Sequence, residues 1–317
     1  MSYLALELAV RERKVAASRS IWNSGSALRS AARACICGSV LLFATGSACL
    51  ASTINLGSAS NYAVLGIGSF LAGDAAGVIN NSNVAITGNV GVGYGGSITN
   101  MAPSSITGDI FQYRDGMYSG PGTLAGSIKT SSRILNQNYA DALSASTQAA
   151  ALNPTQTFGS IGSATTIVGN GGLNVIQVNG NITNSLILSG GANDEFVVNV
   201  AGTLNLTGST VLGLNGGVSA SNVIYNFTSS GQTITTHAGN AISGTLIALH
   251  DDFRIDGSFM GEIIGGGDIT LMSGARVLPG GTLPEPSIFA LLGLGLLGLI
   301  CFGGRRLRFD EFALMRL

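Results

Sequence analysis

The residues best placed to do chemistry form one short segment, His250–Asp256. It holds three carboxylates, an imidazole and a guanidinium, which together can donate and accept protons, as in polysaccharide lyases and hydrolases built on parallel β-helices. The same segment fits a polar corner between two strands, with Arg254 paired to a neighbouring carboxylate, and we prefer this interpretation. The candidate polar residues are Asp251, Asp252, Arg254 and Asp256.

Other reactive groups are sparse. Oxygen ligands occur at Asn193–Glu195 and at Asp251 and Asp252, but neither group has the spaced acids of a calcium loop, and Asn and Asp in turns usually bond their own backbone. Two histidines, His237 and His250, are too few for a three-histidine zinc site. The sequence has no nucleophile elbow and no phosphate-binding loop. We predict no catalytic, metal-binding or cofactor-binding residues, and no cofactor.

Threonine offers chemistry of another kind. A flat array of threonines on aligned strands would let hydroxyls and methyls order water over a broad plane, which is what ice binding requires. The sequence shows only fragments of such an array, and threonine at a strand surface is also an ordinary β residue. The fragments are Thr203 and Thr207, and Thr233, Thr235 and Thr236.

The C-terminal end has the order of a sorting signal. A rigid Pro-Glu-Pro motif precedes an uncharged run at 288–304. As a helix this run would be about 25 Å long, close to the ~30 Å core of a bilayer. Arginines then follow, which would hold the end of the chain in the cytoplasm. The residues of this signal are Pro284, Glu285, Pro286, Arg305, Arg306 and Arg308.

In this order the three parts resemble the PEP-CTERM sorting signal of Gram-negative bacteria, which an exosortase recognises. The resemblance covers Leu283–Arg308, and residues 309–317 extend further than such tails usually do. It implies a transmembrane helix held transiently in the inner membrane and a cut near Pro284–Pro286. The alternative is a C-terminal anchor that is never cut.

The N-terminal end has the pattern of a secretory signal. Arg29 and Arg33 precede an apolar run at 34–50, and small residues surround Ala48 and Ala51. We predict export by the Sec machinery and cleavage near Ala51. The basic region is longer than a simple signal needs, so the true start codon stays open.

These ends divide the chain into a signal region at 1–51, a secreted domain at 52–283 and a sorting tail at 284–317. The cysteines all lie in the two segments that processing removes, so the mature protein would have neither thiol nor disulfide. Lipidation of Cys49 is an alternative, but the usual leucine of a lipobox is missing. The cysteines are Cys35, Cys37, Cys49 and Cys301.

The secreted domain is acidic and weakly charged. Between 52 and 283 there are 5 basic and 11 acidic residues, so its formal charge is 5 − 11 = −6, against −1 for the whole chain. Nucleic acid is therefore not a predicted partner. Gly, Asn, Ser and Thr separate single Val, Ile and Leu residues, and recurrent β-branched residues argue against disorder.

Short apolar runs divided by turn residues predict an all-β domain. Glycine and asparagine corners favour an irregular right-handed parallel β-solenoid over a regular repeat, with a two-sheet sandwich as the alternative. The predicted strands are 63–67, 84–92, 105–110, 173–178, 181–183, 185–188, 195–200, 203–206, 210–214, 223–227, 244–248, 261–265 and 268–271.

One helix interrupts the β pattern. Residues 131–152 contain no Gly or Pro and end before Asn153-Pro154. Its apolar residues are too small to form a core alone, so the helix should lie along the solenoid. The face predicted for this contact comprises Ile134, Leu135, Asn138, Ala142, Ala145, Ala149 and Leu152.

This order of strands, helix and longer β block resembles the ice-binding-like family of secreted bacterial proteins. Leu56–Leu65, Thr87–Val92 and Asn138–Ala142 are similar to that family's opening, early turn and helix, and the stretch 222–266 is similar to the choice-of-anchor A domain, sometimes labelled collagen-binding-like. The resemblance covers about 56–277. It implies a discontinuous right-handed β-solenoid with a helix alongside, and it says little about activity.

Together these observations predict a non-enzymatic, exported protein of the cell surface or extracellular matrix, with a structural or adhesive role in biofilm. Its expected partners are the export machinery, the exosortase and possible contacts with exopolysaccharide or further copies of itself. Two alternatives are an ice-binding protein and a polysaccharide-active β-helix enzyme.

Overall fold

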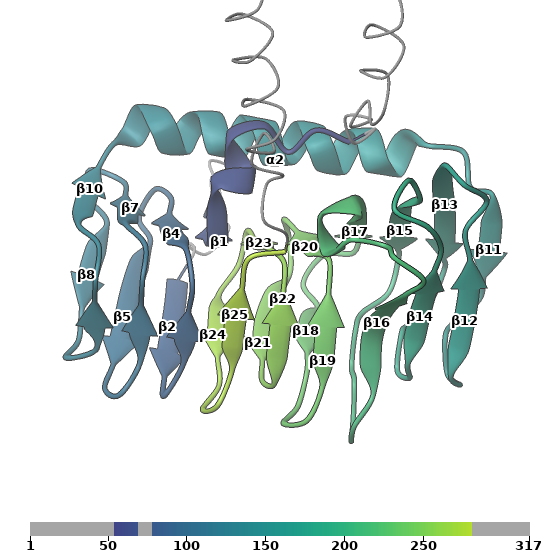
Figure 1. The fold of residues 1–317 in the computed structure, drawn as a ribbon. Coiled ribbons are helices and arrows are strands. Elements are labelled where there is room, and N and C mark those ends of the chain that lie inside the picture. The colour runs from purple at the N-terminus through teal and green to yellow at the C-terminus, as the bar shows by residue number, and fades with distance from the viewer. Residues whose placement is uncertain (1–53, 69–77, 281–317) are drawn as a thin grey trace, which may run out of the picture. The chain divides into compact units, whose positions relative to one another are not determined.

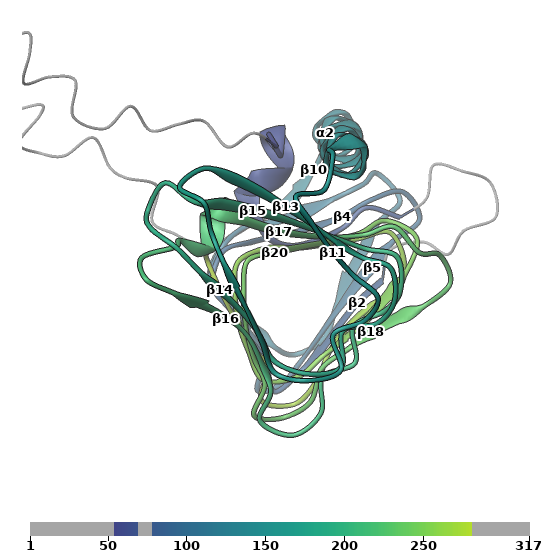
Figure 2. The same cartoon turned by 90° about the vertical axis from the view of Figure 1, so that its right-hand side faces the viewer.

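Short strands and tight corners stack into coils with three sides. The computed structural model describes residues 54–68 and 78–280. By its internal contacts the chain separates into Met1–Ala51 and Ser52–Leu317, and all the described residues belong to the second unit. Seen end-on, the coils form a triangle whose sides are parallel sheets, with helix α2 (Ser132–Ala151) outside one of them (Figure 2).

The side beneath α2 is a ten-stranded sheet. In spatial order its strands are β10 (Ile128–Thr130), β7 (Ile110–Gln112), β4 (Asn89–Val92), β1 (Tyr62–Gly66), β23 (Ile263–Gly265), β20 (Thr245–Ala248), β17 (Val223–Phe227), β15 (Glu195–Val200), β13 (Leu173–Val178) and β11 (Gln156–Phe158).

The other two sides have nine and six strands. The nine-stranded sheet runs β12 (Thr165–Val168), β14 (Leu186–Ser189), β16 (Val211–Asn215), β19 (Ala241–Ser243), β22 (Ser258–Met260), β25 (Arg276–Leu278), β3 (Ala85–Ile86), β6 (Ser105–Ile106) and β9 (Thr123–Leu124). The six-stranded sheet runs β18 (Thr233–Thr235), β21 (Asp252–Ile255), β24 (Ile269–Leu271), β2 (Val78–Ser82), β5 (Ser97–Met101) and β8 (Met117–Ser119). Short 3-10 helices, η2 (Gly57–Asn61) and η3 (Ala220–Asn222), precede β1 and β17.

The chain does not wind from one end to the other. It starts in the middle at β1, coils outward to β10, returns along the ten-stranded sheet as α2, and restarts at the opposite end with β11 (Figure 1). The later coils then return to the middle, where Val64 of β1 pairs with Ile263 of β23. The helix is therefore the connection that makes a discontinuous solenoid possible.

Glycine corners set the close spacing of successive coils. Gly88, Gly108 and Gly126 stack at the corner between the nine- and ten-stranded sheets, and a Cβ on Gly108 would strike the backbone of Gly88. A Cβ on Gly126 would likewise strike Gly108. Only glycine permits such backbone contact, which explains why this residue recurs at strand ends.

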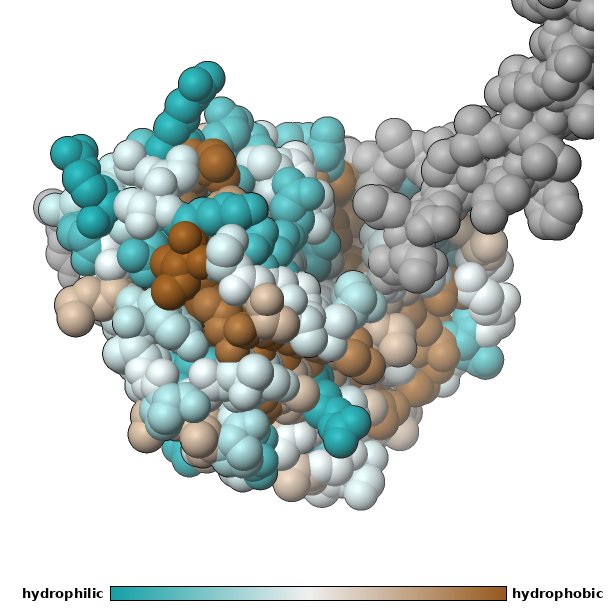
Figure 3. All heavy atoms as spheres, turned by 60° about the vertical axis from the view of Figure 1, so that its left-hand side comes forward, coloured by the Kyte–Doolittle hydropathy of each residue, from teal (hydrophilic) through white to brown (hydrophobic). Residues whose placement is uncertain are grey.

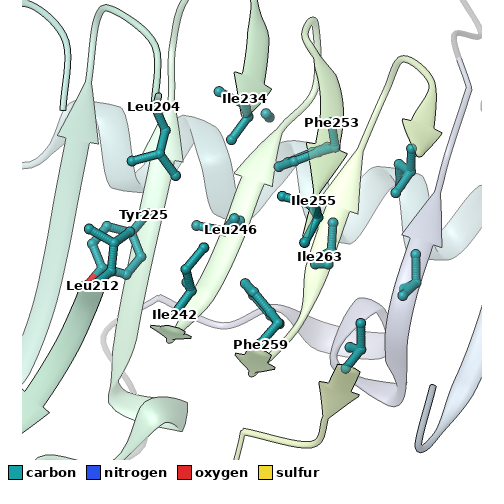
Figure 4. Packing of buried hydrophobic residues seen from close by; sticks show 14 of the residues in the cluster. Leu204, Leu212, Tyr225, Ile234, Ile242, Leu246, Phe253, Ile255, Phe259 and Ile263 are labelled. Atoms are coloured by element: carbon teal, nitrogen blue, oxygen red, sulfur yellow. The ribbon is translucent and has the colours of Figure 1, made fainter. Parts of the chain in front are cut away.

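The interior of the triangle is filled by ladders of aliphatic and aromatic side chains from all three sheets. Leu246 and Ile263 enter from the ten-stranded sheet, Ile242 and Phe259 from the nine-stranded sheet, and Phe253 from the six-stranded sheet (Figure 4). All five are at most 2% exposed. This burial, without disulfides, is the main stabilising contribution to the fold.

A second apolar layer lies between α2 and the ten-stranded sheet. Leu135, Ala142 and Ala145 of the helix are buried there against Leu65 and Ile264 of the sheet. Buried amides orient the helix: Asn138 donates to the Tyr62 hydroxyl (2.7 Å) and Asn199 donates to the carbonyl of Ala149 (2.7 Å). The helix is thus fixed near both of its ends.

The predicted β-solenoid with one flanking helix is confirmed, and the sandwich alternative is wrong. The helix begins one residue after Ser131, whose hydroxyl accepts from the N–H of Ile134, and ends one residue before Leu152. Ile134, predicted on the packed face, is 43% exposed because it lies at the first turn, beyond the centre of the buried stripe.

The strand predictions were least accurate at corners and in the six-stranded sheet, of which only β24 was predicted. The run 84–92 is divided by the corner at Gly88 into β3 and β4, and 105–110 is divided at Gly108 into β6 and β7. Further strands were not predicted, because their short segments carry few apolar residues: β2, β5, β8 to β12, β18, β19, β21, β22 and β25. The segments 181–183 and 203–206 form only isolated bridges.

Candidate functional site

The segment 250–256 is a polar corner only in part, because Asp252–Ile255 alternate exposed and buried side chains and form strand β21. Asp251 lies in the corner, 1% exposed, where its carboxylate accepts from the Ser229 hydroxyl (2.8 Å) and from the N–H of Gln232 (2.9 Å). A carboxylate held by two donors from another coil fixes the position of that coil. Asp251 is therefore part of the framework.

The remaining candidate residues point in different directions. Asp252 and Arg254 are exposed on the outer side of β21, alternating with buried Phe253 and Ile255. Asp256 follows the strand and accepts from the N–H of Gly257 (2.7 Å). The four candidates do not converge on one point, so the geometry provides no paired acid and base.

Asp252 has one notable neighbour, Asp268 on the next coil. The Asp252 carboxylate accepts from the N–H of Asp268 (2.8 Å). Partial burial, and then the charge of Asp252, raise the pKa of the Asp268 carboxyl above its usual range. Within the described ranges, no three His, Cys, Asp or Glu side chains gather as a metal site would require.

Asp194, from the other acidic segment, also holds a corner. Its carboxylate accepts from the N–H of Gly171 (2.7 Å), the N–H of Gly191 (2.8 Å) and the amide of Asn174 (3.1 Å). Burial favours the neutral form, but these donors outweigh it and hold the pKa of Asp194 below its usual range. The donors leave this carboxylate little capacity for a bound ion.

The outer side of the six-stranded sheet carries a row of polar side chains, here called the central row, in which all members except Arg254 are short. Strand pairing places Asn205 beside Thr235, then Arg254, Thr270, Asn80, Thr99 and Ser119 on successive coils. Thr183 extends the row by one coil. The parallel bridge between Ile182 and Leu204 brings the residues that follow them, Thr183 and Asn205, side by side. Neighbouring strands lie about 4.8 Å apart, so the row repeats at that spacing.

A shorter flanking row lies beside it. Thr203, Thr233 and Asp252 precede buried residues of the same sheet, and Ser97 and Met117 continue the row on β5 and β8. Side chains two apart on a strand are separated by about 6–7 Å along it. The two rows together form the polar face, a two-dimensional lattice of hydroxyl and amide groups interrupted by Asp252, Asp268, Arg254 and Met117.

The threonine fragments seen in the sequence have different positions. Thr233 and Thr235 lie on the polar face, and Thr203 joins them by donating to the carbonyl of Thr233 (2.6 Å). Thr236 is 2% exposed and bonded to Asp256 (2.8 Å), while Thr207 lies in an exposed turn. Sequence reasoning missed Thr99, Thr183 and Thr270, because residues far apart in the chain join the row only through coil stacking.

The nine-stranded sheet has a different outer side. Its outward positions include Ile187 and Val211, and Met260 and Leu278 are neighbours on adjacent strands, 46% and 40% exposed. Alanine, serine, threonine and arginine occupy other outward positions, where polar and apolar residues follow one another irregularly. Among the described residues, no helix has the length and apolar character needed to cross a membrane.

Comparison with known proteins identifies the fold. A family description termed ice-binding-like matches residues 71–275, more than half of the chain. The chain belongs to the ice-binding-like family. A solved ice-binding protein from the Antarctic ascomycete Antarctomyces psychrotrophicus is similar, with 21% identity and a TM-score of 0.52 over 72% of this chain and 99% of that one.

Two further solved structures have the same fold. A glycosylated ice-binding protein from an Arctic yeast has 21% identity and a TM-score of 0.53, covering 74% of this ice-binding-like chain and 97% of the yeast chain. An ice-binding protein from an Antarctic biological consortium has 23% identity and a TM-score of 0.51, and the match covers 74% of this chain and 94% of that one. At these identities the likeness shows the fold alone. No curated protein matches the sequence significantly.

The C-terminal tail matches the PEP-CTERM protein-sorting motif at residues 282–307. This ice-binding-like protein is therefore exported through the membrane to the cell surface or beyond, with exosortase processing. The sorting residues, the predicted transmembrane helix 288–304 and the signal cleavage region at Ala48 and Ala51 lie outside the described residues. The predicted cleavage positions stay predictions.

Proposed function

We propose that this exported protein binds ice through the polar face of its six-stranded sheet. The central row carries the proposal, since seven of its eight positions are threonine, asparagine or serine, aligned from coil to coil at one spacing. Each row residue alternates along its strand with a buried aliphatic or aromatic side chain, so the core holds the row in place. Similar folds in solved ice-binding proteins add support.

The second candidate is the structural or adhesive role in an extracellular matrix. Asp252 and Arg254 favour it, because two exposed charges in the middle of the polar face bind water tightly and suit a polar polymer such as exopolysaccharide. In either role the protein is non-enzymatic. Asp251 and Asp256 hold corners and Asp252 stands on an open face, so these three carboxylates do not form a paired acid and base.

The decisive experiment measures ice-growth inhibition by the purified, exported protein. We expect thermal hysteresis and slowed recrystallisation, both strongly reduced by Thr270→Tyr, which places a bulky ring in the central row. Ser258→Tyr is the matched control, since Ser258 is exposed on the nine-stranded sheet and should tolerate the ring. Equal loss in both variants would contradict a role for the polar face.

The same sample separates the alternatives. A protein without any effect on ice that sediments with exopolysaccharide would support the matrix role. Release of soluble oligosaccharide from an acidic polysaccharide, lost in Asp252→Asn, would overturn the non-enzymatic assignment.

A further inference from the structure

Among the residues that the structure describes, the two ends of the solenoid leave strands of every sheet unpaired. At the first end, β10, β9 and β8 each have a strand on one side only. At the second end, β11 and β12 are edge strands, and Ile161 takes the third position through its bridge to Ile182. Unpaired edges of this kind are templates for pairing with another chain.

The first end also exposes part of the apolar interior. One interior ladder runs Val64, Val90, Ile110 and Ile128 on successive coils. The first three are fully buried, whereas Ile128 is 47% exposed, because no coil follows it. Tyr118 and Leu124 are only half-buried at the same end, and hydrophobic atoms reach the surface there (Figure 3).

The charge on the edge strand does not protect this end. Lys129 is the one charged residue of β10, and a lysine commonly blocks an edge. Here its ammonium group lies back on the outer side of the sheet, 2.6 Å from Asp109 and 5.2 Å from the centre of the Phe111 ring. The Lys129 side chain therefore does not block the edge itself.

Helix α2 distinguishes between possible pairings. It runs from the first end to the second (Figure 1), with no acidic residue in its first turn and no basic residue in its last. Its positive and negative dipole ends thus lack compensating side chains. Stacking first end on second end would bring opposite helix ends together, whereas joining two first ends would bring together two positive ends, each with Arg133.

We propose that copies of this protein stack head to tail, with the first end of one copy covered by the second end of the next. Translation along the solenoid axis keeps all strands parallel, so β10 meets β11, β9 meets β12 and β8 meets the segment at Ile161. The second end of another copy is the partner that offers three parallel edges in the same arrangement. Such a contact does not close on itself, so it produces open rods.

Two variants, each blocking one end, test this directly. Ile128→Lys places a charge in the first end, and Gln156→Lys places one in the second, where Gln156 is exposed on β11. Leu143→Lys, on the exposed side of α2, is the control. Thermal melting of each variant checks that the fold is intact.

Sedimentation of the exported protein should show an open series of oligomers that grows with concentration, unchanged in Leu143→Lys. Each blocked variant alone should lose growth beyond the monomer, and their equimolar mixture should form a 1:1 dimer and nothing larger. A wild-type protein that stays monomeric, or a closed dimer insensitive to Gln156→Lys, would overturn the proposal.

Discussion

The two uncovered sides of the solenoid are built from the same coils, yet their outer surfaces differ. The six-stranded side repeats threonine, asparagine and serine in a row from coil to coil, whereas the nine-stranded side mixes Ile187, Val211, Met260 and Leu278 with small residues. Their inward positions are equally apolar. Core packing therefore does not explain the polar row, and the two sides differ in the chemistry of their outer surfaces.

The largest expected effect comes from a charge within the central row. Thr99 and Ser105 lie six residues apart in one coil, on the six-stranded and nine-stranded sheets respectively. Thr99→Lys should lower thermal hysteresis at least ~10-fold, because an ammonium group disrupts ordered water on the row. A ten-fold loss corresponds to a free energy of binding on the order of 1.4 kcal/mol. Ser105→Lys should retain activity. Equal activity in both variants would remove the distinction between the two sides.

The third side, beneath the helix, should make the stability of the fold depend on pH. The Oε2 atom of Glu262 has no hydrogen-bond partner among the described residues, and burial raises the pKa of this carboxyl to about 8. Because the folded protein holds the proton more tightly than the unfolded chain, stability should be greatest at low pH and fall as pH rises from near 4.5 towards 8.

The slope should be roughly 1 kcal/mol per pH unit, measured by urea unfolding at several pH values. Glu262→Gln should flatten this dependence while leaving ice activity unchanged. A slope that persists in the variant would assign the pH response to another group.

Two adjacent aspartates, one in a corner and one on the polar face, should differ in their contribution to stability. Asp251→Ala should lower the free energy of unfolding by about 1–3 kcal/mol, because the Ser229 hydroxyl and the Gln232 N–H lose their buried acceptor. Asp252→Ala removes an exposed carboxylate and should change stability by less than ~0.5 kcal/mol. Chemical denaturation of both variants checks this, and similar losses would place Asp252 in the framework too.

The smallest effect should be a gain. Arg254→Thr would make the central row continuous through β21, and we expect about a two-fold increase in thermal hysteresis. A two-fold change corresponds to a free energy of about 0.4 kcal/mol. Arg276→Thr changes an exposed arginine on β25 of the nine-stranded sheet and should have no effect. Decreased activity in Arg254→Thr, with stronger loss of polysaccharide binding, would favour the matrix role instead.

Several elements could be predicted because their signals are local. Alternating β-branched residues and glycine corners indicated a parallel coil, and the Gly-free and Pro-free stretch after Ser131 indicated the helix almost to the residue. The sorting motif at the C-terminus is local as well. Corner positions such as Gly88 were harder, because a glycine within an apolar run can continue a strand or end it.

The sequence by itself determined the class of fold, the C-terminal sorting motif and the absence of cysteine between residues 52 and 283, since each depends on composition or on residues close together in the chain. Only the tertiary structure decided which threonines share a surface. Thr99 and Thr270 are separated by most of the domain, and both flank Asn80 because the chain starts in the middle and closes β1 against β23. Coil lengths vary, so the register between coils is set by core packing and cannot be counted along the sequence.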